Sequence, residues 1–159
     1  MIQIVIKVSN QKLYLNEGSN CLKSWDISTA KNGVGQNEGS FQTPLGKHIV
    51  RAKIGHDIPK GGVLVGRRFT GEVYSEDLAS QWPKRDWILT RILWLSGCEL
   101  HRNRLGDCDT MRRYIYIHGT PDTEPMGEPH SHGCIRMRND AITELFELIP
   151  PYTSVLISE

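Results

Sequence analysis

The segment RRYIYIHGT, residues 112–120, carries the clearest strand pattern in the chain. Aromatic and polar side chains alternate in it with isoleucines, and a period of two sends the two sets to opposite faces of a strand. One face takes Tyr114, Tyr116 and His118, and the other takes Ile115 and Ile117. His118 therefore stands at the end of a predicted strand, where the chain enters a loop rich in Gly, Pro and acidic residues.

Strand signals of the same kind recur on both sides of this segment. The chain begins with alternation over Ile2–Val8, and short turns separate it from LYL (13–15) and from a β-favouring run, Cys21–Ala30. A long loop rich in Gly and Asn follows and ends in the strand KHIVRAKIG, 47–55. Later strands are predicted in DWILTRILWL (86–95) and TSVLI (153–157). The pattern predicts one mainly β domain over residues 1–159, with about 56–110 as a lid or substrate-wall insertion.

Two short helices are predicted beside these strands. SEDLASQW, residues 75–82, has Ser75 as its expected N-cap and acidic residues in its first turn. NDAITELFELIPP, residues 139–151, has an apolar face at helical spacing, formed by Ile142, Leu145, Phe146 and Ile149. Asn139 or Asp140 is expected to cap its start, and a pair of prolines ends it.

Composition narrows the classes of protein. The chain has 159 residues, a net charge of +1 and 38% hydrophobic residues, which is typical of a folded domain and gives no argument for nucleic acid. No apolar run is long enough for a transmembrane helix. The start MIQIVIKVSNQKLYL reads as a strand rather than a signal peptide, so we expect a cytoplasmic location, or a periplasmic one if a leader has been removed. The four cysteines show no CxxC pair, which favours reduced thiols.

The segment HSHGCIRM, residues 130–137, holds the residues with the most chemical potential. His118, His130, His132 and Cys134 could supply nitrogen and sulfur ligands to zinc, but their spacing matches no familiar zinc motif. Cys134 could instead be an inert thiol in a tight turn. Its polar, histidine-rich surroundings and the preceding Gly133 favour a third reading, a reactive thiol to which a substrate backbone can come close.

A cysteine attacks a carbonyl efficiently as its thiolate, so it needs a base within reach. His118 is suited to that role because a regular strand fixes its direction. The oxyanion that forms needs N–H donors, and the backbone of His132, Gly133 and Cys134 is a natural source. On spacing alone, these residues predict a cysteine acyl-transferase.

The combination IHGT (117–120) and SHGCIRM (131–137) resembles the signature of the L,D-transpeptidase catalytic domain, the YkuD-like family. FQTPLGKHIV (41–50) is similar to the upstream Thr-Pro-x-Gly segment of that family, and NDAITELFELIPPYTSVLI (139–157) to its closing helix and strand. The resemblance implies a mixed β-sandwich or barrel-like domain with a short helix after the catalytic cysteine. It covers most of the chain, although the 12 residues between His118 and Ser131 make a short loop for the pattern.

The resemblance also implies a role for each matching residue. Cys134 would be the nucleophile and His118 its base, with the Gly119 carbonyl orienting the imidazole. Ser131, His132 and Gly133 would shape the catalytic loop and the oxyanion site. For His132, we expect the backbone to matter more than the ring. Arg136 is assigned to substrate contact, and the further arginines of 102–113 could also meet the carboxylates of a substrate.

The implied substrate is a peptidoglycan stem tetrapeptide in which the L-centre of a diamino acid is joined to D-Ala. Cys134 would expel D-Ala and form a thioester, which water would hydrolyse or an amine would turn into a cross-link. A cytoplasmic protein would meet soluble muropeptides, so we expect an L,D-carboxypeptidase of murein recycling rather than a cross-linking L,D-transpeptidase. No cofactor or metal is implied, the partners are peptidoglycan-derived peptides, and the sequence does not define an oligomeric state.

A different class of function stays open at this point. The domain could bind peptidoglycan without catalysis, or it could sense redox state through its thiol. The intact set of Cys134, His118 and Gly133 argues against a silent binding module, and no cysteine that could resolve a disulfide lies near Cys134 in the sequence.

Overall fold

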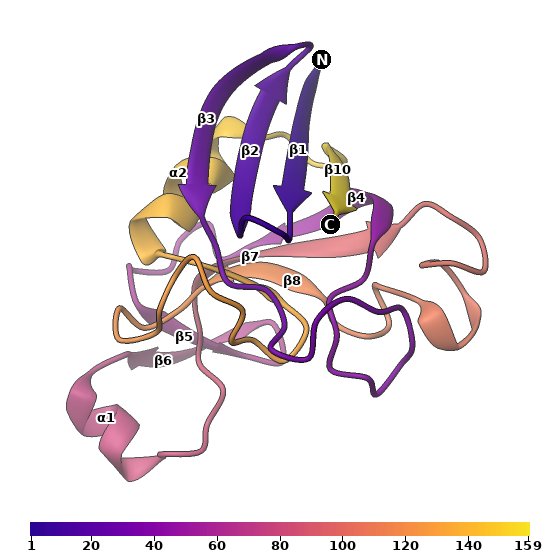
Figure 1. Cartoon of the computed structure of the whole chain (residues 1–159). Coiled ribbons are helices and arrows are strands. Elements are labelled where there is room, and N and C mark those ends of the chain that lie inside the picture. The colour runs from indigo at the N-terminus through magenta and orange to yellow at the C-terminus, as the bar shows by residue number, and fades with distance from the viewer.

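The strands of the computed structural model, which describes all of residues 1–159, form one ten-stranded sheet (Figure 1). Its main path runs β3-β2-β1-β10-β4-β7-β5-β6, while β8 pairs with β7 and with β9. The strands are β1 (Ile2–Lys7), β2 (Lys12–Glu17), β3 (Asn20–Asp26), β4 (Gly46–Ile54), β5 (Gly62–Val65), β6 (Arg68–Val73), β7 (Ile88–Gly97), β8 (Tyr116–Gly119), β9 (Ile135–Met137) and β10 (Ser154–Ser158). The helices are α1 (Glu76–Gln81), a single 3-10 turn (Gly106–Cys108) and α2 (Asn139–Leu148). The prediction of a mainly β protein is confirmed.

The two ends of the chain meet in one part of the sheet. β1 pairs antiparallel with β2 and parallel with β10, so the first and last strands lie side by side (Figure 1). The alternation predicted at the N-terminus holds, because Ile4 and Ile6 are buried while their neighbours face outward. They pack with the apolar face of α2, whose Ile142 and Leu145 are also fully buried. This shared core fixes α2 against the sheet.

The predicted strand at 112–120 is shorter in the structure. β8 begins only at Tyr116, and Tyr114 has a left-handed backbone with φ +57°. The reason lies upstream, where the Asp109 carboxylate accepts hydrogen bonds from the backbone of Leu105 and Arg112 and holds the chain in turns. The alternation itself is correct over β8, since Ile117 lies in the main core and Tyr116 lies on the other side with Ile92 and Leu64.

The predicted N-cap is confirmed for α1 and is wrong for α2. Ser75 caps α1 as expected, and its hydroxyl accepts a hydrogen bond from Leu78 N at 3.0 Å. The expected cap at Asn139 or Asp140 is wrong, because Arg138 is the N-cap and its side chain makes no capping bond. Asn139 is buried, and its amide bonds instead to Thr90 and to the Thr120 carbonyl. The buried amide joins α2 to β7 and to the end of β8.

The range 56–110, expected as a lid or wall, contains one central element of the sheet. β7 lies between β4 and β5 and also pairs with β8. A register shift in the β7–β8 pairing, between Leu89 and Ile92, separates the two parts of β7. The hairpin β5–β6 and helix α1 project away from β1–β3 (Figure 1). The part of this range that can serve as a wall is therefore the hairpin and the residues just before β7.

The parallel pair β8–β9 brings two distant segments together. Ile117 pairs with Ile135, and His118 pairs with Arg136. The residue before β9 is Cys134, so the thiol lies beside β8, two residues ahead of the Arg136 that pairs with His118. No helix of the structure is both long enough and apolar enough to cross a membrane.

Candidate active site

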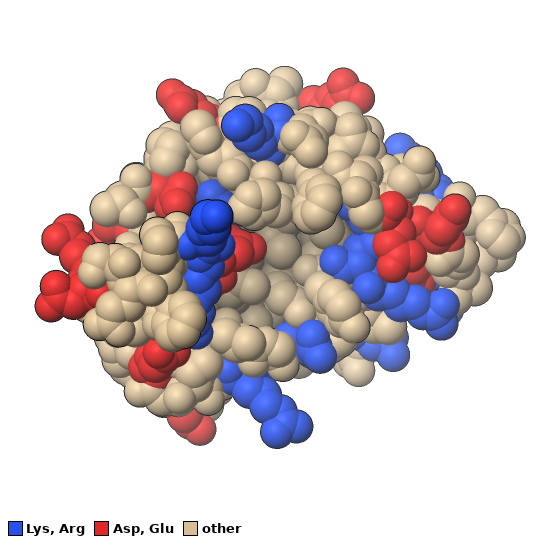
Figure 2. All heavy atoms as spheres, turned by 90° about the horizontal axis from the view of Figure 1, so that it is seen from below, with Lys and Arg blue, Asp and Glu red and all other residues tan.

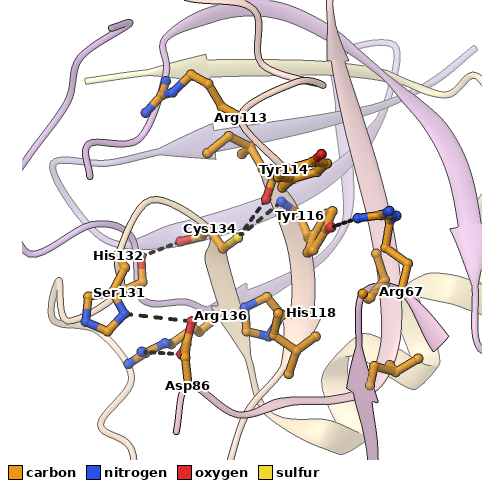
Figure 3. A pocket seen from close by; sticks show the side chains of 15 residues that line it. Arg67, Asp86, Arg113, Tyr114, Tyr116, His118, Ser131, His132, Cys134 and Arg136 are labelled. Carbon is orange, nitrogen blue, oxygen red and sulfur yellow. Dashed lines mark hydrogen bonds and ion pairs between the residues drawn. The ribbon is translucent and has the colours of Figure 1, made fainter. Parts of the chain in front are cut away.

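A cavity of about 490 Å³ lies on the lower face of the molecule as drawn in Figure 1, where Figure 2 shows a hollow bordered by basic side chains. Its volume is in the range that holds a small ligand or a short peptide segment. The residues that line it and carry polar chemistry are Arg67, Asp86, Arg113, Tyr114, Tyr116, His118, Ser131, His132, Cys134 and Arg136 (Figure 3). The cavity therefore collects Cys134, His118, Ser131, His132 and Arg136, which the sequence singled out.

Cys134 is half-buried at the centre of this group (Figure 3). Its Sγ accepts a hydrogen bond from Tyr116 N at 3.3 Å, and its S–H donates to the Tyr114 carbonyl at 3.4 Å. No hydrogen bond joins Sγ to His118 in this state. The thiol proton therefore points to a backbone carbonyl, and the thiol must turn before an imidazole can take that proton.

His118 is almost fully buried at the end of β8. Its Nδ1–H donates to the Gly119 carbonyl at 2.6 Å, and this contact leaves Nε2 as the unprotonated nitrogen of the neutral ring. A Cβ at Gly119 would collide with Asn139 Oδ1 and with the Leu89 carbonyl, so only glycine fits. Close packing behind Gly119 thus holds the carbonyl that orients His118.

The loop before Cys134 is tied to two other segments. Ser131 bonds through its backbone to Thr29 and Lys31, and its hydroxyl donates to the Cys134 carbonyl. Thr43, from the predicted Thr-Pro-x-Gly segment, donates to the Gly133 carbonyl at 2.9 Å. Gly133 has a φ of +133°, which a residue with a side chain rarely adopts. The loop shape thus depends on glycine at position 133 and on contacts from the N-terminal third of the chain.

The three predicted oxyanion donors are not equivalent. Gly133 N–H donates to Ser131 Oγ at 3.2 Å and is used inside the loop. The N–H groups of His132 and Cys134 make no hydrogen bond with the protein. These two groups are the ones available to an oxyanion near Sγ.

Asp86 connects the two other predicted residues, His132 and Arg136. Its carboxylate lies 3.3 Å from Arg136 Nη2 and 3.8 Å from His132 Nδ1 (Figure 3). Arg136 also pairs with Glu124 at 3.4 Å and is only 6% exposed. The charge of Arg136 is thus already matched by two carboxylates, which weakens the expectation that it contacts an anionic substrate.

Burial and charge set the proton affinities of the two central groups. Burial raises the pKa of the Cys134 thiol to about 12, and the nearby Asp86 carboxylate adds to this rise. Burial also lowers the pKa of His118, and its bond to the Gly119 carbonyl opposes that effect. At neutral pH both groups are therefore uncharged, and the resting pair is a thiol and an imidazole rather than an ion pair.

The arginines of 102–113, which were expected to meet the carboxylates of a substrate, do not all reach the cavity. Arg113 alone of these lines the cavity, and burial lowers the pKa of its guanidinium. Arg102 pairs with Glu99 instead. Arg112 and Arg104 line a hollow on another part of the surface. Arg112 also lines a hollow of about 330 Å³, together with Arg113. Of these arginines, only Arg113 therefore reaches the cavity that holds Cys134.

Several residues of the cavity have no signal in the sequence. Asp86 comes from the loop before β7 and Arg67 from the turn before β6, and neither belongs to a motif. For Tyr114 and Tyr116 the sequence predicts a place on a strand face but no part in the site. Their backbone groups, which contact Sγ, carry no sequence signal.

The structure also shows where the four candidate zinc ligands lie. His130 lies outside the cavity and pairs with Glu128 at 3.1 Å, while His132 faces Asp86. The four candidate ligands do not gather into a cluster that could hold a metal ion. All four cysteines are free thiols.

Removing the charge of Asp86 is expected to make Cys134 more reactive. Asp86→Asn removes a carboxylate that raises the pKa of the thiol. It also leaves the Arg136 cation, which lowers that pKa, with one carboxylate partner instead of two. We expect the rate of alkylation of Cys134 by iodoacetamide at neutral pH to rise roughly threefold to tenfold. The rate is followed by intact mass in a background of Cys21→Ser and Cys98→Ser, which removes the two exposed thiols.

The matched control for this experiment is Asp57→Asn, because Asp57 is 96% exposed and lies outside the cavity. It should leave the alkylation rate unchanged. A rate that stays the same or falls in Asp86→Asn would show that Asp86 does not act on the thiol through its charge.

The fold and the cavity define a class of mainly β domains in which a cysteine directly precedes one strand and a histidine lies in the parallel strand beside it. The chain belongs to the L,D-transpeptidase catalytic domain family, YkuD, whose model matches residues 2–157. A segment of 47 residues is 51% identical to YqjB of Bacillus subtilis (strain 168), which is provisionally named an L,D-transpeptidase. That segment makes up 30% of this chain and 27% of YqjB.

Solved structures share the fold over nearly the whole chain. The L,D-transpeptidase of Xylanimonas cellulosilytica DSM 15894 (residues 123-326) superposes with a TM-score of 0.62, at 18% identity over 99% of this chain and 60% of that one. L,D-transpeptidase LdtMt1, solved in complex with imipenem, superposes with a TM-score of 0.58 at 17% identity, over 99% of this chain and 58% of that one. The chain thus covers about 60% or less of the length of these relatives.

Proposed function

We propose that the protein cleaves the bond between the diamino acid and D-Ala in peptidoglycan stem tetrapeptides, with Cys134 as nucleophile and His118 as general base. The observation that carries this proposal is their placement in one cavity, with the Nδ1 of His118 held by Gly119 so that Nε2 is free to accept a proton. Membership of the YkuD family and the imipenem complex of LdtMt1 support the same chemistry.

The first half of the reaction needs a proton transfer because the pKa of the thiol is raised to about 12. His118 Nε2 takes the S–H proton as Cys134 Sγ attacks the scissile carbonyl carbon. The N–H groups of Cys134 and His132 stabilise the resulting oxyanion, and the Tyr116 N–H contributes to holding Sγ in place. When the C–N bond breaks, the imidazolium gives its proton to the amine of D-Ala, and a thioester remains on Cys134.

We propose water as the acceptor in the second half, which makes the activity an L,D-carboxypeptidase. His118 takes a proton from water as the oxygen attacks the thioester, and it then returns a proton to Sγ, so the enzyme is restored and a tripeptide is released. Water needs no site of its own beyond the first cavity. The cytoplasmic location stays a prediction, which fractionation of the producing cells would check.

Product analysis tests the acceptor directly. Purified protein is incubated with tetrapeptide, alone and with an excess of a second stem peptide that offers a free amine, and the products are identified by mass. We expect tripeptide and D-Ala in both mixtures. Cross-linked dimer without tripeptide would make the proposed hydrolysis wrong, and neither product would make the proposed cleavage wrong.

Cross-linking is the second candidate, and one feature favours it. Another hollow, of about 330 Å³, adjoins the first and shares Arg113, Tyr114, Ile115 and His132 with it. An acceptor peptide lying there would reach the thioester from the side opposite to Arg67. In that case the mixture with the added amine would contain mostly dimer.

A further inference from the structure

Three arginines line the cavity, and two of them are already engaged. Arg136 pairs with Asp86 and Glu124. Arg113 has four acceptors, namely the carbonyls of Gly35, Gln36 and Gln42 and the hydroxyl of Ser40. Both guanidinium groups therefore hold the protein together and have few donors left for a ligand.

Arg67 is different, because no carboxylate pairs with it. Its one hydrogen bond runs from Nη1 to the Tyr116 hydroxyl at 3.1 Å (Figure 3). Its Cζ lies 4.7 Å from the Trp94 ring centroid and 5.0 Å from that of Tyr114. These rings and the hydroxyl fix the plane of the guanidinium, while Nε and Nη2 keep donors that the protein does not use. A fixed guanidinium with free donors at a cavity wall is suited to an anion.

The backbone conformation of Arg67 is a second observation about this residue. Gly66 and Arg67 form the turn between β5 and β6 with φ values of +55° and +63°. Such a turn is usually built from Asn and Gly, because other residues are strained at a positive φ. An arginine is therefore a less favourable residue than Asn or Gly at this position of the turn.

Tyr116 relates Arg67 to the reacting atoms. The Tyr116 N–H donates to Cys134 Sγ, and the hydroxyl at the other end of the same residue accepts from Arg67. One tyrosine thus spans the space between the thiol and the guanidinium. A peptide whose scissile carbonyl lies at Sγ would bring groups a few bonds away from that carbonyl to Arg67.

We propose that Arg67 binds a carboxylate of the acyl-donor peptide and makes the enzyme specific for donors that carry it. The inference rests on the proposed function, since it names the donor by the reaction at Cys134. A donor of this class offers two such groups, the terminal carboxylate of the leaving D-Ala and a carboxylate on the side chain of the diamino acid. The guanidinium can hold either one by two parallel hydrogen bonds.

The test compares kcat/KM of wild-type protein and Arg67→Gln on three donors. One donor has both carboxylates, the second has a terminal amide, and the third has the side-chain carboxylate as an amide. We expect Arg67→Gln to lose roughly 30- to 100-fold on the first donor, because a charge-assisted bidentate contact is removed. The loss should disappear on one of the amides, and that amide identifies the bound carboxylate. A loss that is equal within about threefold on all three donors, or no loss at all, would overturn the proposal.

Two further variants separate binding from folding. Arg68→Gln is the matched control, since Arg68 is the exposed neighbour that does not line the cavity, and it should leave all three values unchanged. Arg67→Lys keeps the charge but loses the fork, so it should recover only part of the activity on the first donor. Thermal unfolding of each variant shows whether a loss of kcat/KM is caused by destabilisation of the fold.

Binding without turnover keeps this inference distinct from the proposed function. Calorimetry on the Cys134→Ser variant measures the Kd of the donor with both carboxylates (the acid) and of each of the two amide donors. A preference for the acid that is absent in Cys134→Ser/Arg67→Gln supports the role of Arg67 even if the wild-type protein cleaves none of the peptides. Cleavage by the wild type together with equal Kd values for acid and amides would instead leave the proposed function standing and the role of Arg67 overturned.

Discussion

Replacement of Cys134 by serine is expected to lower kcat/KM on the stem tetrapeptide by on the order of 10³-fold or more. A hydroxyl has a higher pKa than the thiol and is a weaker nucleophile. The same variant should form no covalent adduct with imipenem, whereas wild-type protein should gain the mass of one molecule. Intact mass spectrometry and product analysis measure the two effects on the same samples.

Cys98→Ser is the matched control for this experiment. Cys98 is exposed and lies outside the cavity, so the control should keep both the activity and the adduct. An imipenem adduct that persists in Cys134→Ser, or one that is absent from the wild type, would contradict the role of Cys134 as the acylated residue. The second outcome would favour a binding or redox function for the domain.

Replacement of His118 by glutamine is expected to lower kcat/KM by roughly 10²- to 10⁴-fold at neutral pH. The pKa of the Cys134 thiol is raised to about 12, so very little thiolate exists without a base to take the proton. The activity that remains should rise roughly tenfold per pH unit from about pH 8 to about pH 11, as the thiol ionises by itself. Alkylation of Cys134 should follow the same pH dependence.

The wild-type profile should look different because the base is present. Burial lowers the pKa of His118 below its ordinary value of 6.5, so the imidazole stays neutral until the pH falls below that value. The activity should therefore be close to its plateau at neutral pH and decline only on further acidification. His130→Gln is the control, since His130 is exposed and pairs with Glu128 outside the cavity. A steep rise with alkaline pH in the wild type as well would mean that His118 does not act as the base.

Local pattern was enough to predict much of the fold. Alternation identified the strands around Ile4 and Ile117, and helical spacing identified the buried face of α2. These predictions succeed because burial of one face has a period that is written in neighbouring residues. The ends of elements were predicted less well, as Tyr114 and Asn139 show. The conformation of Tyr114 depends on the turns that Asp109 holds just before it, and that of Asn139 depends on Thr90 from β7.

The sequence by itself determined which residues could carry chemistry, since a histidine at a strand end and a Ser-His-Gly-Cys segment are motifs of adjacent residues. Only the tertiary structure decided what surrounds them. Asp86 reaches Arg136 and His132, Tyr116 lies between Cys134 and Arg67, and Thr43 supports Gly133. These contacts join residues that are far apart in the chain, and no local pattern encodes them. They arise because the parallel pairing of β8 with β9 and the position of the β5–β6 hairpin bring the segments to one cavity.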